Sequence, residues 1–260
     1  MKLCRTIEIT LVIFLVALRA IAEPGRNNLT ACFDLTDACE EWQPGFADYP
    51  AGQEMFYELT AQCASDPTNL NRGFFLSGAN HSDDLFMFIK HPVCGLKPSG
   101  AYEVEALVRI LSKAPTGCIG VGGDPGAGVY VKFGASAIEP APVLQPDGRL
   151  RMNVDIGQQS NSGSNAVVIG DIATGITDCF NEEYEAKELQ TAASLAAQAD
   201  ENGTLWIFAG ADSGFEGRTS LFFTHVHVHM HHTPTEKNQT KKKDKTENST
   251  HDGGGNGCNH

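Results

Sequence analysis

Histidines alternate with other residues at the end of the apolar part of the chain. His225, His227, His229 and His231 are separated from one another by single residues. On a β-strand, residues with this spacing share one face and lie ~6–7 Å apart. Neighbouring imidazoles there could bind a borderline metal ion such as Zn²⁺ or Cu²⁺. The pattern therefore predicts a transition-metal site, with a solvated strand face as the alternative.

A second set of candidate ligands is acidic. Carboxylates in loops that also contain Gly, Asn or Ser can supply the oxygen-rich shell that Ca²⁺ requires. The chain has no EF-hand spacing, so solvated loop carboxylates or weak, multivalent attraction of Ca²⁺ are the alternatives. The candidate calcium ligands are Asp83, Asp84, Asp124, Asp155, Asp212 and Glu216.

No catalytic motif accompanies these residues. The chain contains no GxSxG, HExxH or P-loop pattern. We therefore expect a protein that is not an enzyme and requires no cofactor, although it could bind calcium, zinc or copper. A carbohydrate-active hydrolase or lyase is the alternative, because such enzymes need only two suitably placed carboxylates. Asp155, Asp212, Glu216 or Glu58 could supply such a pair.

The charge balance excludes some partners. The chain has 19 Lys and Arg residues against 32 Asp and Glu residues, which gives a net charge of −13. This acidity argues against nucleic acid or an anionic membrane surface as the main partner. Divalent cations, glycans, the extracellular matrix or a mineral surface remain as predicted partners.

The first residues have the pattern of a secretory signal peptide. Lys2 and Arg5 precede an apolar run from Ile9 to Leu18, and Ala20-Ile21-Ala22 fits a signal-peptidase site. The apolar run is shorter than the ~20 residues that span a bilayer. We predict a signal peptide over residues 1–22 and a secreted, extracellular product without membrane insertion.

Cysteines and glycosylation motifs agree with secretion. An even number of cysteines between the signal and the tail predicts three disulfides in an oxidising compartment, without choosing among the 15 possible pairings. These cysteines are Cys32, Cys39, Cys63, Cys94, Cys118 and Cys179, while Cys258 is left over. Sequons predict a glycoprotein modified at Asn28, Asn80, Asn202, Asn238 and Asn248.

Apolar periodicity predicts an all-β body. Apolar and polar residues alternate over Tyr102–Ile110 and Leu150–Ile156, which is typical of strands with one buried face. We expect one antiparallel, jelly-roll-like β-sandwich over residues 23–232 and a disordered Lys-, Asn- and Gly-rich tail over 233–260. A helical turn is predicted near Glu182. The other predicted strands are Phe56–Leu59, Phe74–Leu76, Leu85–Ile89, Val129–Phe133, Val167–Ile172, Leu205–Phe208 and Leu221–His231.

Local motifs resemble known sandwich proteins. Gly95-Leu96-Lys97-Pro98 followed by Tyr102-x-Val104 resembles the tyrosine corner of fibronectin-type and carbohydrate-binding-module sandwiches. Over Trp42–Phe223 the chain also resembles a family of exported bacterial proteins, many of them lipoproteins, that have no assigned function. The resemblance implies the sandwich fold and no activity. Its segments are Gly45–Pro50, Asn80–Phe88, Met152–Gly157 and Asp212–Gly217.

Overall fold

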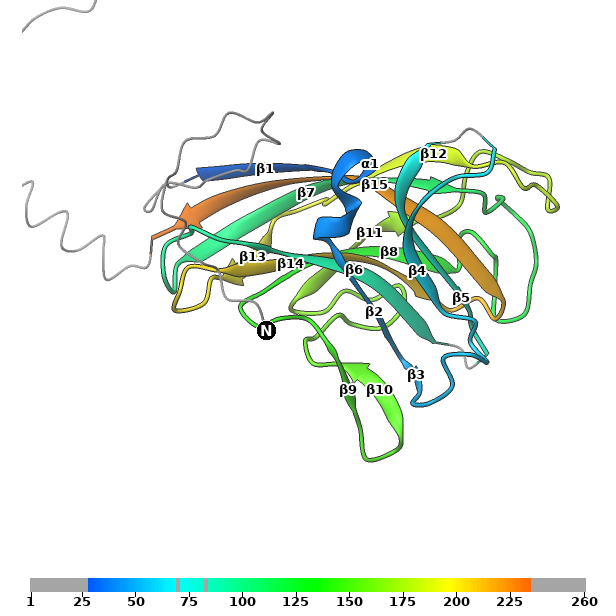
Figure 1. Cartoon of the computed structure of the whole chain (residues 1–260), viewed down its shortest axis with the longest axis horizontal. Helices are drawn as coiled ribbons and strands as arrows, with labels where there is room; N and C mark the ends of the chain where they lie inside the picture. Colours follow the sequence, from blue (N-terminus) through cyan, green and yellow to red (C-terminus); the bar gives the residue numbers. More distant parts are fainter. Residues whose placement is uncertain (1–27, 69–70, 82–83, 235–260) are drawn as a thin grey trace, which may run out of the picture.

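The computed structural model describes residues 28–68, 71–81 and 84–234. In this part of the chain two antiparallel sheets face each other, and the larger of them has seven strands. Its strand order is β12-β7-β15-β5-β4, with β1 also beside β15 and β13 also beside β7 (Figure 1). The strands are β1 (Asn28–Asp34), β4 (Thr60–Ser65), β5 (Arg72–Ala79), β7 (Ala101–Ser112), β12 (Glu185–Gln190), β13 (Leu195–Gln198) and β15 (Arg218–Thr233).

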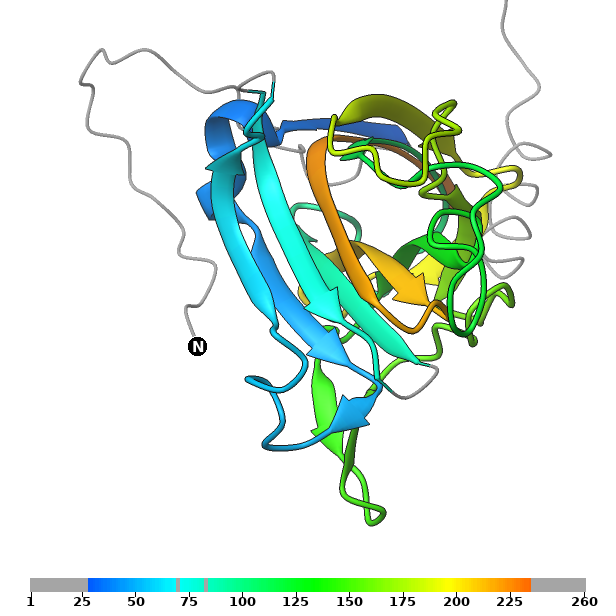
Figure 2. The same cartoon turned by 90° about the vertical axis from the view of Figure 1, so that its right-hand side faces the viewer.

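The second sheet has five antiparallel strands in the order β11-β8-β14-β6-β2 and curls toward the first (Figure 2). It contains β2 (Gln43–Ala47), β6 (Leu85–Val93), β8 (Val129–Ser136), β11 (Ala166–Asp171) and β14 (Leu205–Ser213). A small sheet adds β3 (Tyr49–Pro50), β9 (Pro142–Leu144) and β10 (Arg149–Met152), and a helical segment adds α1 (Leu35–Ala38) and η1 (Cys39–Glu41). The predicted antiparallel β-sandwich is confirmed.

The core lies between the two sheets and follows the predicted alternation. On β7, Val104 and Val108 are fully buried, while Glu103 and Glu105 on the opposite face are exposed. The tyrosine corner is also present, because the Lys97 backbone N–H donates to the Tyr102 hydroxyl at 2.9 Å. Burial of one face of each sheet thus selects the strand register.

Three predicted elements differ from the structure. Phe56–Leu59 is not a strand, because backbone bonds from Tyr57 to Gln53 and from Leu59 to Glu54 fold this segment into turns. The strand predicted over Leu150–Ile156 ends at Met152, after which the chain folds across the second sheet. No helix forms near Glu182, which instead precedes β12 in an extended segment.

Glycines allow phenylalanine rings to lie flat on the outer face of the second sheet. A Cβ on Gly45 would come within 2.2 Å of the Phe88 ring, and one on Gly134 within 2.1 Å of the Phe208 ring. Each glycine is the cross-strand partner of its phenylalanine. Val154 and Ile156 pack over these rings and form a second, smaller core. The segment after β10 is thereby held against the outer face of this sheet.

Within the part of the chain that the structure describes, two disulfides form, where three were predicted. Cys39 bonds to Cys63, and Cys118 bonds to Cys179. Cys32 is exposed on β1, and Cys94 follows β6 and accepts a hydrogen bond from the Thr204 hydroxyl at 3.9 Å. Neither thiol is bonded to another described cysteine. The prediction of a third bridge is therefore wrong for Cys32 and Cys94. An even number of cysteines does not show which sulfur atoms lie close enough to bond.

The prediction that the chain does not insert into a membrane can be compared with the structure only for the described residues. Among them, no helix has the length and apolar character needed to cross a bilayer. The predicted signal peptide and nearly all of the predicted tail lie outside the described residues.

Candidate functional site

A buried ion pair lies on the outer face of the second sheet. Lys132 on β8 and Asp212 on β14 are 0% and 1% exposed, and Lys132 Nζ is 2.7 Å from Asp212 Oδ2. Lys132 also donates to the Ile156 carbonyl at 2.8 Å, and the Gln159 N–H donates to Asp212 at 2.8 Å. The segment that covers the sheet is therefore bonded to both members of the pair.

Two further carboxyl groups adjoin this pair. Asp84, directly before β6, is 8% exposed, and its carboxyl group hydrogen-bonds that of Asp212. Asp48 links β2 to β3 and is 7% exposed, with a left-handed φ of 66°. Left-handed backbone is uncommon for non-glycine residues, although Asp is among those that tolerate it. Arg151 lies 3.1 Å from Asp48 Oδ1 and 3.7 Å from Asp84 Oδ2.

These groups border a hollow of about 420 Å³. Asp48, Asp84 and Arg151 line it together with Met152, and the other lining residues belong to the covering segment, which is Val154–Gln158. We call this hollow the acidic hollow. Asp212 and Lys132 lie beneath it, out of contact with solvent. A ligand in the hollow would meet the carboxyl groups of Asp48, Asp84 and Asp155 and one guanidinium group.

Crowding of carboxyl groups changes their protonation. Burial, together with the neighbouring charges of Asp48 and Asp212, raises the pKa of Asp84 to about 8. Burial and the charge of Asp212 also raise the pKa of Asp48, although Arg151 opposes the shift. Asp212 Oδ1 has no hydrogen-bond partner among the described residues, and one of the two hydrogen-bonded carboxyl groups must carry the shared proton. At neutral pH a protonated Asp84 therefore both donates and accepts hydrogen bonds.

The raised pKa of Asp84 predicts a dependence of stability on pH. The unfolded chain loses this proton near pH 4, whereas the folded chain keeps it to about pH 8. The free energy of unfolding contributed by this group therefore falls as pH rises through that window. We compare the free energy of unfolding of Asp84→Asn with that of the wild type. The difference is expected to shift in favour of the variant by on the order of 2 kcal/mol between pH 5 and pH 8, after discounting for solvent screening.

Urea unfolding of wild type and D84N at the two pH values measures this gain. Glu201→Gln is the control, because Glu201 is an exposed turn residue. A difference between D84N and wild type that is the same at pH 5 and pH 8 would contradict the raised pKa.

The predicted calcium ligands separate into different places. Asp84 and Asp212 come together, and Asp155 lines the same hollow, but its carboxylate accepts the Gly157 and Ser164 N–H groups. These backbone bonds are the main reason why the pKa of Asp155 is lowered. Asp83 lies outside the described residues. Glu216 follows β14 in the loop that bonds to Val121, and it is not among the residues lining the acidic hollow.

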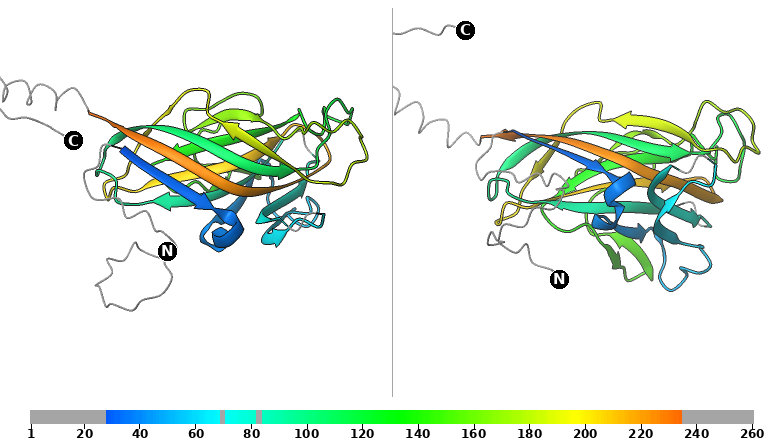
Figure 3. Two further views of the ribbon diagram at one scale, coloured as in Figure 1. Left: turned by 90° about the horizontal axis from the view of Figure 1, so that it is seen from above. Right: turned by 45° about the horizontal axis from the view of Figure 1, so that its top comes forward.

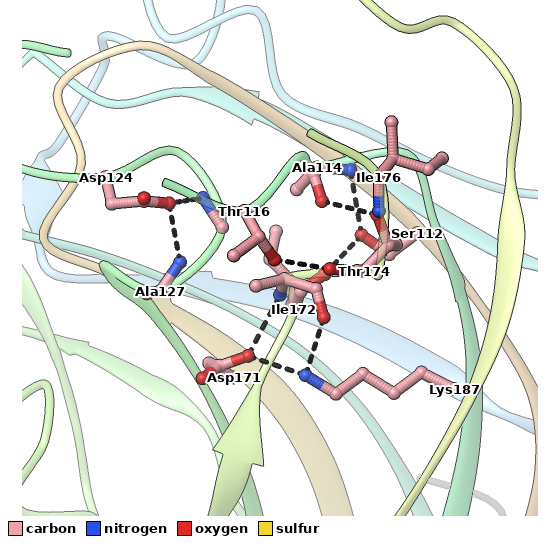
Figure 4. A network of polar contacts seen from close by, with 12 residues as sticks. Ser112, Ala114, Thr116, Asp124, Ala127, Asp171, Ile172, Thr174, Ile176 and Lys187 are labelled. Atoms are coloured by element: carbon pink, nitrogen blue, oxygen red, sulfur yellow. Dashed lines mark hydrogen bonds and ion pairs between the residues drawn. The ribbon is translucent and has the colours of Figure 1, made fainter. Parts of the chain in front are cut away.

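Asp124 is also used in a turn. Its carboxylate accepts the N–H groups of Gly126 and Ala127 at 2.7 and 2.9 Å (Figure 4). Its other oxygen accepts the Gly117 N–H at 3.0 Å. These bonds fix the loop next to Cys118 and leave Asp124 apart from the other candidate ligands.

Three members of the site were not predicted from sequence: Asp48, Lys132 and Arg151. Lys132 had a usable signal, since it is a charged residue inside the apolar strand predicted over Val129–Phe133. A lysine in such a run is rarely buried without a partner. Asp48 and Arg151 gave no comparable signal, because their meeting depends on the pairing of β3 with β10.

The four predicted histidine ligands lie on one face of β15, as expected. His227, His229 and His231 are exposed, and His225 is half-buried with Nε2 3.6 Å from Asp34 Oδ1. This face belongs to the larger sheet, whereas the acidic hollow lies on the smaller one. Metal binding by these histidines stays a prediction.

The predicted glycosylation sites differ in accessibility. Asn28 and Asn202 are exposed, whereas Asn80 is 1% exposed and its amide donates to the Ser213 and Phe215 carbonyls. A glycan on Asn80 would break both bonds, so the folded chain does not present this sequon. Asn238 and Asn248 lie outside the described residues.

No protein-family model matches the chain, and no curated protein sequence matches it. In fold it is similar to the module TmCBM61 in complex with beta-1,4-galactotriose, with 12% identity, a TM-score of 0.32 and coverage of 72% of this chain and 86% of that one. For the mannan-recognising module TmCBM27 the identity is 12%, the TM-score 0.35 and the coverage 78% and 98%.

The VP2 subviral particle of infectious bursal disease virus gives comparable values. Its identity is 8%, its TM-score 0.31 and the coverage 67% of this chain and 33% of that one. The two modules and VP2 thus give similar identities and TM-scores.

Proposed function

We propose that this protein is a secreted, non-catalytic binding protein that holds a glycan in the acidic hollow. The observation that carries the proposal is the arrangement of Asp48, Asp84 and Arg151 around an open space of about 420 Å³. Sugar hydroxyls both donate and accept hydrogen bonds. An ionised carboxylate, a protonated carboxyl group and a guanidinium fork together offer partners for both roles.

An aromatic pair lies near Asp84 in the chain. The rings of Phe56 and His81 are tilted by 32° with centroids 4.3 Å apart, and Phe56 is 58% exposed. Two residues separate His81 from Asp84 along the chain, so their Cα atoms lie within ~11 Å of each other. A flat aromatic face beside polar groups supports the binding of a sugar ring.

Secretion is part of the proposal. Two disulfides are typical of proteins that fold in an oxidising compartment. The apolar segment near the start of the sequence supports export, and the exposed Asn28 and Asn202 support glycosylation. An association with the extracellular matrix or with mineral would rest on the net charge of −13 alone.

A glycan array probed with the full secreted chain tests the proposal, followed by calorimetry on the best ligand. We expect Arg151→Gln to weaken binding at least tenfold, because Arg151 is the only cationic side chain among the residues lining the hollow. Glu201→Gln should bind like the wild type. An array without any bound glycan, or equal affinity for R151Q and wild type, would refute the proposal.

A carbohydrate-active hydrolase is the second candidate, favoured by the raised pKa of Asp84. A carboxyl group that is protonated at neutral pH beside an ionised one can act as a general acid. Of the four carboxylates suggested by sequence, Glu58 forms a surface ion pair with Arg218, and Asp155 closes a turn. Release of reducing ends from a bound glycan by wild type, but not by D84N, would establish this candidate instead.

A further inference from the structure

Three strands place complementary side chains on the exposed face of the larger sheet. β15 lies between β1 and β7, as seen from above in Figure 3. His227 lies opposite Cys32 of β1 and Leu107 of β7. His229 lies opposite Thr30 of β1 and Glu105 of β7. Side chains directly opposite each other have Cβ atoms ~4.5–5.5 Å apart, so Glu105 can reach the imidazole of His229.

A hollow of about 330 Å³ opens on this face. His227, His229 and Glu105 line it, and so do Thr30, Gln190 and Thr191. The hollow lies where β12 ends at Gln190 and before β13 begins at Leu195. Thr191 bonds to the backbone of Ala106 of β7 between them, through its N–H and its hydroxyl group. Of the four histidines on this face, only two border the hollow.

The imidazoles on this face differ in their hydrogen bonds, and His231, whose Nδ1 lies 2.5 Å from Asn28 Oδ1, does not line the hollow. His225 has both ring nitrogens near polar atoms, with Nδ1 3.1 Å from the Thr224 hydroxyl and Nε2 3.6 Å from Asp34. His229 uses Nδ1 toward the Thr30 hydroxyl at 3.0 Å. A bond at Nδ1 orients the ring and leaves Nε2 as the ligand atom, which is the usual arrangement at metal sites.

Glu105 and His227 are available as ligands. Within the described part of the chain, Glu105 has neither a hydrogen bond nor an ion pair, although Glu103 beside it accepts a bond from Ser194. The ring of His227 contacts that of His225 with centroids 6.4 Å apart. Carboxylates at this face also make its potential favourable for cations.

We propose that His227, His229 and Glu105 bind one borderline divalent transition-metal ion, with water as the fourth ligand. Two imidazoles and a carboxylate with an open position form an established ligand set for Zn²⁺. As the side chains stand, no three of these donors lie within 4.8 Å of one another, so they rotate to close around the ion. All three side chains are exposed, which allows this rotation.

The geometry excludes the thiol of Cys32 from this ligand set. Cys32 and Glu105 lie on opposite sides of β15, two strand spacings or ~9.6 Å apart across the sheet. A cysteine side chain is too short to share an ion with Glu105 over that span. Cys32 also does not line the hollow. Cys32→Ser is therefore a matched control on the same surface.

The test is titration of the full secreted chain with Zn²⁺ by calorimetry and with Co²⁺ by absorption spectroscopy. We expect one site that His227→Gln and His229→Gln each weaken at least tenfold and Glu105→Gln weakens severalfold. Cys32→Ser and His81→Gln should keep wild-type affinity, and the Co²⁺ spectrum should lack a thiolate charge-transfer band. Equal affinity for H227Q and wild type, loss of binding in C32S, or a thiolate band would overturn the assignment.

A pH series gives an independent readout. Besides the two ligand histidines, the charged and titratable groups on the same face of these strands are Cys32 and Asp34 on β1, Glu103, Glu105 and Arg109 on β7, His225 and His231 on β15, and Glu188 on β12. A metal ion and a proton compete for the same imidazole nitrogen. Because two imidazoles bind the ion, we expect the affinity to fall by up to ~100-fold per pH unit on acidification. An affinity that does not change between pH 7.5 and pH 5.5 would contradict ligation by histidine.

Discussion

Replacing Lys132 with methionine is expected to lower the free energy of unfolding by about 3–5 kcal/mol. The change leaves the carboxylate of Asp212, which is 1% exposed, without its ion-pair partner. Water cannot replace the lost ammonium group, because Val154 and Ile156 cover the sheet at this point. The cost is therefore mainly that of an uncompensated buried charge rather than of a lost attraction.

Urea unfolding of three variants separates these contributions. Lys187→Met is the matched control, because Lys187 pairs with Asp171 at 2.6 Å while both side chains are partly exposed. We expect K187M to cost less than about 1 kcal/mol. The double variant K132M/D212L should be more stable than K132M alone, since it removes the unpaired charge. A K132M variant as stable as K187M would show that the buried pair contributes little.

Loss of the Cys118–Cys179 disulfide should have an effect of similar size. The bond closes a loop with a sequence separation of 61. The chain-entropy model assigns about 4 kcal/mol to a loop of this length, because the cross-link restricts the unfolded chain. Replacing both cysteines by serine in C118S/C179S is thus expected to lower the thermal midpoint substantially. Calorimetric unfolding under non-reducing conditions measures the shift.

The surrounding hydrogen bonds determine whether the folded loop survives this change. The Thr174 N–H and hydroxyl both donate to the Ala114 carbonyl at 2.9 Å, and the Thr116 N–H donates to the Ile176 carbonyl at 2.7 Å (Figure 4). We expect the loop to keep its conformation, so that the loss of stability comes from the unfolded state. C39S/C63S is the comparison, with a smaller expected loss of about 3 kcal/mol for a separation of 24. A larger loss for this shorter loop would contradict the entropic explanation.

Asp84 connects stability with the proposed function. A carboxyl group whose pKa is raised to about 8 is costly to keep in the fold at neutral pH. Strained or destabilised groups of this kind concentrate at functional sites. An increase in stability of D84N, together with weaker glycan binding, would be the result expected of a functional residue.

The sequence by itself determined the sandwich architecture and most of its strands. Alternation over Tyr102–Ile110 predicted β7 correctly, and the corner formed by Lys97 and Tyr102 was also correct. It also placed the histidines of β15 on one face. These features depend on periodicity, since one buried face of a strand imposes a period of two on the apolar residues.

The tertiary structure alone decided which groups meet. The structure pairs Cys39 with Cys63 and Cys118 with Cys179, a choice that the even number of cysteines did not make. Asp48 and Arg151 meet because β3 pairs with β10, and Glu105 lies beside His229 because β7 pairs with β15. Cross-strand neighbours are distant in sequence, and no local pattern encodes their register. For this reason the acidic hollow and the proposed metal site both emerged only from the arrangement of the strands.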